Sequence, residues 1–235
     1  MSKNVLIVTA TEQTLEDFKR DSVLYKSYLL LKKVYEDKLD IHVVSNNAEG
    51  LSTIYNKFLV NKYKDNIIAF VHDDVEILSV NLVDALNDST WDITGLAGGT
   101  EYSIKESCMW HLSCPPEKLS GAVSHPVVIR NADGTLQGDT TKQAVSYYGS
   151  WPSRCTVIDG LFMAVKVDRA LQTNFKFDED FNFHFYDISS CILANKCKMT
   201  VGTYPIHVHH LGLGDSAFSD SWKQSHKKFI NKWLC

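Results

Sequence analysis

The sequence contains no apolar run long enough to cross a membrane, which would take about 20 consecutive apolar residues. Its longest candidate for a targeting segment, Val5–Val8, is far shorter than the core of a signal peptide. We therefore expect a soluble protein without a membrane span. Its expected location is the cytoplasm of a bacterium, or of the host cell if a phage encodes it.

Cysteine pairs and a strong charge of either sign are also absent. The 6 cysteines form no C-x-x-C pair, which argues against a zinc ribbon and for reduced thiols. A formal net charge of -4 provides no overall attraction to nucleic acid. With 235 residues and 44% hydrophobic content, the chain can bury a sizeable core, and we expect a single domain.

Strand-like and helix-like patterns alternate in the first part of the chain. Buried-strand patterns cover 4–9, 39–44 and 67–71, and helical spacing of apolar residues covers 12–35 and 51–59. Such alternation is typical of an α/β fold with a mainly parallel sheet flanked by helices. In these folds ligands bind at the carboxyl ends of the strands.

The later part of the chain contains an irregular tract and then more regular elements. The tract over about 95–150 is rich in Gly, Ser, Thr and Pro, and we expect it to form an insertion over the active site. Beyond it, the sequence predicts a strand over 156–167, interrupted at Asp159-Gly160, a helix over 187–194 and a strand over 200–208. The glycine in the interrupted strand would allow a ligand or another backbone to approach closely.

Three polar residues, His72, Asp73 and Asp74, follow directly after the apolar strand over 67–71. Neighbouring carboxylates repel each other unless a cation or hydrogen-bond donors neutralise them. Mg²⁺ and Mn²⁺ prefer carboxylate oxygens, and Mn²⁺ also accepts imidazole. The tripeptide therefore suggests a metal site; the alternative is an aspartate that only caps the following turn.

Five segments, in this order, resemble landmarks of the GT-A nucleotide-sugar glycosyltransferases of the family-two type, particularly the small bacterial and phage members. They are Asn47-Ala48-Glu49-Gly50-Leu51-Ser52 through Asn56, similar to the N-x-x-G-L-S-x-x-x-N helix start; His72-Asp73-Asp74, similar to the D-x-D strand end; Asp159-Gly160-Leu161-Phe162-Met163, similar to the acceptor-side D-G segment; Phe185-Tyr186-Asp187-Ile188, similar to the E-D helix start; and 207–214 with Phe229-Ile230-Asn231-Lys232-Trp233, similar to the late histidine loop and the F-x-x-K-W ending. The sequence departs from the pattern at His72, which replaces the first aspartate, and at Tyr186, which replaces the glutamate. The resemblance spans nearly the whole chain and implies a GT-A (Rossmann-like) fold.

The resemblance also implies a metal-dependent, inverting glycosyltransferase that uses a nucleoside-diphosphate sugar. Asp74 corresponds to the final metal-binding aspartate, and a metal held there would stabilise negative charge on the leaving phosphate. Other metal ligands would come from His72 and the late histidines, where His209 and His210 are the candidates. Hydrogen-bonded core histidines are the alternative for these positions. Contacts to the donor are expected from Thr9, Ala10, Glu12, Asn46, Asn47, Asn56, Asp73, Gly160 and Gly212, with Gly214 as a further loop glycine.

The acceptor hydroxyl needs a base that removes its proton during attack. Asp187 is the first candidate, because a helix start favours the ionised carboxylate and would keep it available at neutral pH. His184 is the second candidate. A plain helix cap is the alternative for Asp187, and a packed or surface histidine is the alternative for His184.

The acceptor is expected to be a saccharide or, as in some phage enzymes, a hydroxymethylated base in DNA. Trp110 and Trp151 lie in or beside the insertion and could pack against sugar rings, although tryptophans also serve as core residues. The lysines of the last helical segment could contact phosphates or simply form a solvated helix face. Two other functions are compatible with the residues: a metal-dependent hydrolase, and a catalytically silent protein that binds a sugar nucleotide.

Overall fold

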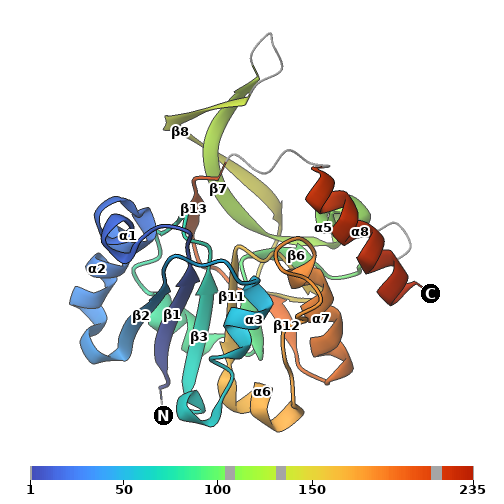
Figure 1. Cartoon of the computed structure of the whole chain (residues 1–235), viewed down its shortest axis with the longest axis horizontal. Helices are drawn as coiled ribbons and strands as arrows, with labels where there is room; N and C mark the ends of the chain where they lie inside the picture. The colour runs from blue at the N-terminus through green and yellow to red at the C-terminus, as the bar shows by residue number, and fades with distance from the viewer. Residues whose placement is uncertain (1, 104–108, 131–135, 213–218, 235) are drawn as a thin grey trace.

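The computed structural model describes residues 2–103, 109–130, 136–212 and 219–234 (Figure 1). In its first part, the predicted strands are confirmed as β1 (Asn4–Ala10), β2 (Leu39–Val44) and β3 (Asn66–Val71). The helical pattern over 12–35 forms two helices, α1 (Leu15–Asp21) and α2 (Val23–Tyr35). They separate at Ser22, whose extended backbone ends α1 while its hydroxyl caps α2 by accepting a hydrogen bond from the Tyr25 backbone N–H.

The remaining elements follow the predicted order with shorter bounds. The helix over 51–59 is α3 (Leu51–Asn56), and the interrupted strand over 156–167 forms β10 (Val157–Ile158) and β11 (Phe162–Lys166). The last predicted strand likewise forms two strands, β12 (Val201–Thr203) and β13 (Val208–His210). Other elements are β4 (Val75–Ile77), α4 (Leu82–Asp88), β5 (Ile93–Gly95), β6 (Ala97–Gly99), α5 (Trp110–Ser113), β7 (Leu119–Arg130), β8 (Leu136–Gly149), β9 (Ser153–Cys155), α6 (Val167–Thr173), α7 (Tyr186–Lys196) and α8 (Asp220–Trp233), with short 3-10 turns at Glu36–Lys38, Asn61–Tyr63 and Pro116–Lys118.

The larger sheet has the strand order β2-β1-β3-β11-β5-β12-β9 in the described part of the chain. Strands β2, β1, β3, β5 and β12 run in one direction, and β11 and β9 run against their neighbours. Helix α3 packs on β1, and α6 packs on β3 and β11, in front of the sheet in Figure 1. This arrangement confirms the predicted α/β fold with a mainly parallel sheet flanked by helices.

A smaller sheet contacts the larger one, with β10 and β6 against β12. Its order is β10-β6-β7-β13-β4, and β8 pairs with β7. The tract over 95–150, predicted as irregular, supplies much of this sheet, and β7 and β8 form a long antiparallel ribbon that projects from the body in Figure 1. Repeated hydrogen bonding between these strands explains the regular structure, even though the tract is rich in turn-forming residues.

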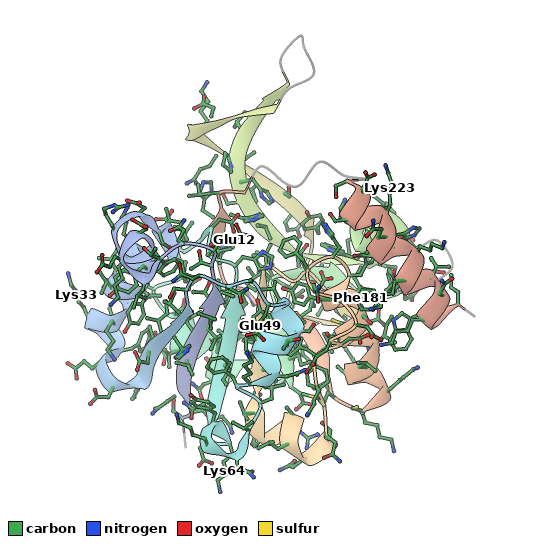
Figure 2. All side chains as sticks on the ribbon, viewed as in Figure 1. Glu12, Lys33, Glu49, Lys64, Phe181 and Lys223 are labelled. Carbon is green, nitrogen blue, oxygen red and sulfur yellow. The ribbon has the colours of Figure 1, made fainter. Side chains whose placement is uncertain are left out.

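The hydrophobic core centres on β3, whose residues Ile67 to Val71 are all buried. Helix α3 lies against this strand, and the rings of Tyr55 and Phe70 stack with their centroids 4.2 Å apart. Figure 2 shows charged side chains such as Lys33 and Lys64 at the outside of the molecule. Strand β3 therefore fixes the position of His72, the next residue, and of Asp74, two residues further on. Among the described residues, no helix is both long and apolar enough to span a membrane.

Candidate functional site

The carboxyl end of β3 and the end of β13 bring together His72, Asp74 and His210. Their potential ligand atoms all lie within 4.8 Å of one another. Strand pairing produces this arrangement, because His210 lies opposite Val75 in the β4–β13 register and the Leu211 N–H donates to the Asp74 carbonyl at 2.9 Å. His210 Nε2 lies 3.2 Å from Asp74 Oδ2. Two distant segments therefore supply one compact cluster.

The cluster fits a divalent cation in two further respects. Asp74 Oδ1 is buried, and no described group forms a hydrogen bond with it, so it remains available as a ligand. Gly212 lies directly over the cluster: a Cβ atom there would be 2.5 Å from Asp74 Oδ2 and 2.7 Å from His210 Nε2. A side chain at this position would therefore fill the space over the cluster of His72, Asp74 and His210, hereafter the metal-type cluster.

The charges of the cluster compensate one another. Burial alone would raise the pKa of Asp74, but its hydrogen bond with His210 and the nearby imidazoles lower that pKa overall. Burial opposes protonation of His210, yet the hydrogen bond and charge of Asp74 raise the pKa of His210. Burial lowers the pKa of His72 and keeps this imidazole neutral, the form that binds metals.

The neighbouring late histidine, His209, lies outside this cluster. It is 3% exposed, and its Nδ1 lies 3.4 Å from Ser124 Oγ. Successive residues of a strand point to opposite faces, so only one of the two histidines can face Asp74. The structure places His210 there and leaves His209 as a packed strand residue.

Asp187, the predicted base, lies in the first turn of α7 and faces the interruption between β10 and β11. Its Oδ2 accepts a hydrogen bond from the Gly160 N–H at 3.0 Å. Burial, followed by the negative charge of Asp159, raises the pKa of Asp187 to about 7, although backbone N–H groups oppose this rise. The helix start was expected to keep this carboxylate ionised; backbone N–H groups do lower its pKa, but desolvation outweighs them.

A cavity of about 330 Å³ opens beside Asp187. The carboxyl group of Asp159 is held at its wall, where Oδ2 accepts from Trp110 Nε1 and Oδ1 accepts from the Leu161 N–H, each at 3.0 Å. Asp159 belongs to the predicted D-G segment, but no task was predicted for it. Other residues lining this cavity are His72, His111, Gly160, Phe183, His184, Tyr186 and Trp222.

His184, the second candidate base, also lines this cavity, and its Nε2 lies 3.3 Å from Ser221 Oγ of α8. Trp222 is the next residue of α8 and packs against Phe185 with ring centroids 5.3 Å apart. The C-terminal helix therefore forms one wall of the cavity. Sequence reasoning missed this wall because a helix start and an amphipathic pattern do not indicate where a helix docks.

A second cavity of about 560 Å³ lies at the carboxyl ends of β1 and β2. Four of the expected donor contacts line it: Ala10, Glu12, Asn47 and Asp73. Glu12 and Glu49, both labelled in Figure 2, line this cavity. Because Phe183 lines this cavity as well as the one beside Asp187, the two cavities are neighbours.

Three other expected donor contacts have different positions. Thr9 is fully buried, and Asn46 lies in the turn after β2 with its N–H donating to the Gln13 carbonyl at 2.8 Å; neither lines the cavity. Asn56 donates to the Phe177 carbonyl at 2.9 Å and to Glu179 Oε1 at 2.8 Å, so it anchors a turn rather than a ligand. Gly214 lies outside the described residues.

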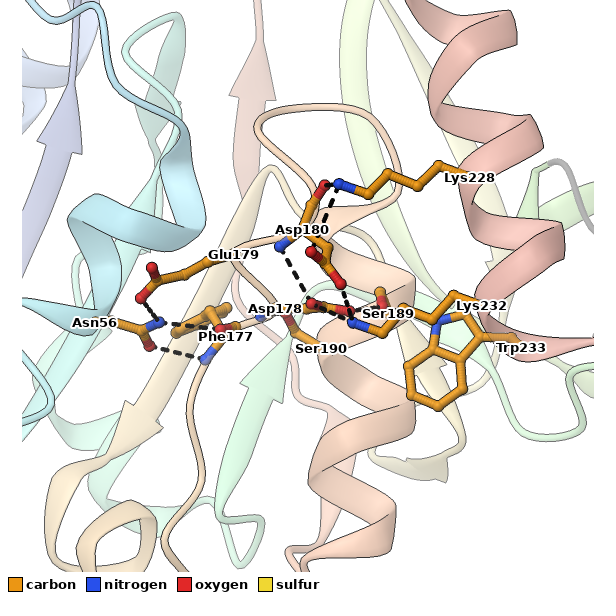
Figure 3. A network of polar contacts seen from close by, with 10 residues as sticks. All are labelled: Asn56, Phe177, Asp178, Glu179, Asp180, Ser189, Ser190, Lys228, Lys232 and Trp233. Carbon is orange, nitrogen blue, oxygen red and sulfur yellow. Dashed lines mark hydrogen bonds and ion pairs between the residues drawn. The ribbon is translucent and has the colours of Figure 1, made fainter.

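The turn over 177–180 connects α3, α7 and α8 (Figure 3). Asp178, which is 5% exposed, accepts two hydrogen bonds from Lys232 Nζ at 2.6 and 2.7 Å. Lys228 Nζ donates to the Asp180 carbonyl at 2.6 Å. Two lysines of α8 are thus engaged within the protein and hold this helix in place.

The two tryptophans of the sequence analysis differ in position. Trp110 lines the cavity beside Asp187, whereas Trp151 packs edge-on against His207 with ring centroids 5.5 Å apart and does not line that cavity. Trp110 is 4% exposed and its ring packs against Tyr148 with centroids 4.9 Å apart, so the core alternative describes Trp110 as a buried residue of the cavity wall.

Comparisons with known proteins give the family of this chain and structures with a similar fold. The profile of the Glycosyltransferase like family matches residues 21–233. The catalytic domain of Drosophila β1,4-galactosyltransferase 7, in complex with xylobiose, is similar in structure with a TM-score of 0.56 and 11% identity, covering 96% of this chain and 79% of that chain. A variant of the same Drosophila enzyme, in complex with manganese, UDP-Gal and xylobiose, is similar with a TM-score of 0.52 and 10% identity. The match covers 95% of this chain and 79% of that chain. GalNAc-T7 with UDP, GalNAc and Mn²⁺ is similar with a TM-score of 0.52 and 11% identity, and the match covers 98% of this chain and 48% of that chain. No curated protein matches the sequence.

Proposed function

This chain belongs to the Glycosyltransferase like family, and on that premise we propose that it is a metal-dependent, inverting glycosyltransferase. It moves a hexosyl or pentosyl group from a nucleoside-diphosphate sugar to a hydroxyl group of an acceptor. One observation carries the proposal: the cluster of His72, Asp74 and His210 adjoins a cavity that contains a carboxylate with a raised pKa, Asp187.

The cluster would hold a divalent cation, with Mn²⁺ preferred to Mg²⁺. Two imidazoles and one carboxylate suit a transition ion, whereas Mg²⁺ strongly prefers oxygen ligands. When bound, the cation supplies positive charge that stabilises the leaving diphosphate. The similar Drosophila structure with manganese and UDP-Gal supports this choice of cation and donor.

The cavity at the ends of β1 and β2 would bind the nucleoside. Glu12 provides a carboxylate suited to ribose hydroxyls, and Asn47, whose amide also bonds the Glu49 backbone, lines the same cavity. Asp73 lines the same cavity and lies between His72 and Asp74 in the sequence. A donor in this cavity would therefore extend its diphosphate toward Asp74.

Asp187 would act as the catalytic base. In the proposed step, the acceptor oxygen forms a bond to the anomeric carbon while its proton passes to Asp187. The bond from that carbon to the diphosphate breaks, and the electron pair leaves with the phosphate. A pKa of about 7 suits this task, because a base is most effective when its pKa lies near the working pH. His184, which lines the same cavity, is the second candidate for the base.

We propose a saccharide as the acceptor. Phe183, which is 52% exposed, and Trp222 line the cavity beside Asp187, and flat aromatic faces pack well against sugar rings. A base in DNA is less well supported, because Lys228 and Lys232 are already paired with groups of the 177–180 turn. In this view the chain works as a single GT-A-like domain in which the tract over about 95–150 lies on the acceptor side.

The test is release of nucleotide from a panel of sugar nucleotides with Mn²⁺, with and without a chelator. Wild type is compared with Asp74→Asn and Asp187→Asn, and Asp88→Asn, at the exposed end of α4, serves as the matched control. We expect chelator-sensitive release from one donor, lost in Asp74→Asn and Asp187→Asn and kept in Asp88→Asn.

The other outcomes identify the alternatives. Release that needs no acceptor and survives Asp187→Asn would indicate a hydrolase. If the protein binds a sugar nucleotide but releases no nucleotide with any saccharide acceptor, it is a silent binding protein. That result would overturn the proposed transfer.

A further inference from the structure

Two residues that depart from the family pattern, His72 and Tyr186, contact each other. His72 Nε2 lies 3.1 Å from the Tyr186 hydroxyl oxygen. The two residues come from different elements, since His72 follows β3 and Tyr186 is the first residue of α7. The contact therefore connects the metal-type cluster to the helix that carries Asp187.

The hydrogen bonds around Tyr186 determine where the imidazole proton lies. The Tyr186 hydroxyl donates to the Gly160 carbonyl oxygen at 2.6 Å, and a carbonyl can only accept. A tyrosine hydroxyl has one proton, so the contact with His72 must use an oxygen lone pair. The proton of this second hydrogen bond must therefore belong to Nε2 of His72, which leaves Nδ1 as the ring atom with a lone pair.

On this basis we propose that Tyr186 is the positioning residue for His72, selecting the tautomer that presents Nδ1 as a metal ligand. Ligating histidines commonly donate their second ring N–H to an oxygen, which sets both the tautomer and the ring orientation. The inference rests on the metal site of the proposed function. It assigns Tyr186 a task in cation binding instead of in proton transfer.

The surroundings keep the pair in a single arrangement. Tyr186 is 2% exposed, and Phe183 stacks on the His72 ring with centroids 5.7 Å apart and 27° between the planes. A Cβ at Gly160 would lie 2.6 Å from the Tyr186 oxygen, so the glycine is needed for the hydroxyl to reach its carbonyl partner. The imidazole is thus held both at its face and at Nε2.

The test measures binding of Mn²⁺ alone by electron paramagnetic resonance, and the tautomer of His72 by ¹⁵N NMR on the metal-free protein. Tyr186→Phe removes only the hydroxyl. Tyr28→Phe is the matched control, because it removes the hydroxyl of another buried tyrosine, which donates to Asp40 of β2 at 3.2 Å, outside the cluster. His72→Ala and the double variant complete a cycle, and circular dichroism checks that each variant folds.

We expect wild type to carry the proton on Nε2, and Tyr186→Phe to lose that preference and bind Mn²⁺ about 10- to 100-fold more weakly. In the His72→Ala background, Tyr186→Phe should have no further effect, since it acts through His72. If Tyr186→Phe changes neither the Mn²⁺ affinity nor the tautomer of His72, or if the two substitutions have additive effects, the role of Tyr186 is overturned. The proposed metal site would not be affected by that result. Wild type that binds no Mn²⁺ contradicts the metal site of the proposed function, and with it the ligand role of His72.

Discussion

Trp110 Nε1 donates a hydrogen bond to Asp159 Oδ2 over 3.0 Å, and this contact holds a second carboxylate beside Asp187. The charge of Asp159 is, after burial, the next cause of the raised pKa of Asp187. The indole comes from the tract over 95–150, so this tract contributes to the electrostatics of the site as well as to its walls. Two carboxylates in one cavity with different environments are a common way to adjust a base.

The first prediction concerns the pH dependence of sugar transfer. A base must be ionised to act, so kcat/KM should rise with pH and reach half its maximum near pH 7, where the pKa of Asp187 lies. Asp159→Asn removes a negative charge that disfavours ionisation, so the rising limb should move to lower pH. Profiles are measured at saturating Mn²⁺, with Asp88→Asn as control. An unmoved limb in Asp159→Asn would show that Asp159 has no influence on the base.

A second prediction concerns the space over the metal-type cluster. Gly212→Ala would place a Cβ 2.5 Å from Asp74 Oδ2, so Asp74 or His210 must move. We expect Mn²⁺ affinity to fall roughly tenfold or more, the effect typical of disturbed ligand geometry. Titration with Mn²⁺, alongside thermal unfolding to exclude a loss of fold, measures this. Wild-type affinity in the variant would mean that the loop over the cluster adapts freely.

The ion pair shown in Figure 3 leads to a prediction about stability. Lys232→Met leaves the carboxylate of Asp178, which is 5% exposed, without its charged partner. Breaking such a pair should lower the free energy of unfolding by about 3 to 5 kcal/mol. Lys223→Met is the matched control: Lys223 is exposed and forms an ion pair with Asp220 of the same helix, so its loss should change stability by less than about 1 kcal/mol. Urea unfolding measures both, and equal effects would argue against a buried anchor for α8.

The last prediction tests the wall formed by α8. Trp222→Ala removes an aromatic surface from the cavity beside Asp187 while leaving the cluster and the donor cavity intact. We expect KM for a saccharide acceptor to rise roughly tenfold, the equivalent of about 1.4 kcal/mol of lost contact. Donor hydrolysis without acceptor should be unchanged. Lys223→Ala, the next residue of the helix, is the control, and a rise in donor KM instead would place Trp222 on the donor side.

The amino-acid sequence by itself determined the alternation of strands and helices, because apolar periodicity depends only on which residues lie on each face. It also determined that His72 and Asp74 come at the carboxyl end of a buried strand, and that Asp187 lies in the first turn of a helix. These are local properties, and the structure retains them at β3 and α7.

Only the tertiary structure decided between His209 and His210, since strand alternation separates two neighbours without showing which face meets Asp74. It also decided that Asn56 anchors a turn, that α8 contributes Trp222, and that burial outweighs the helix start at Asp187. Desolvation, and contact between segments far apart in the chain, depend on how the elements pack. That packing brings His210 to Asp74 and Tyr186 to His72.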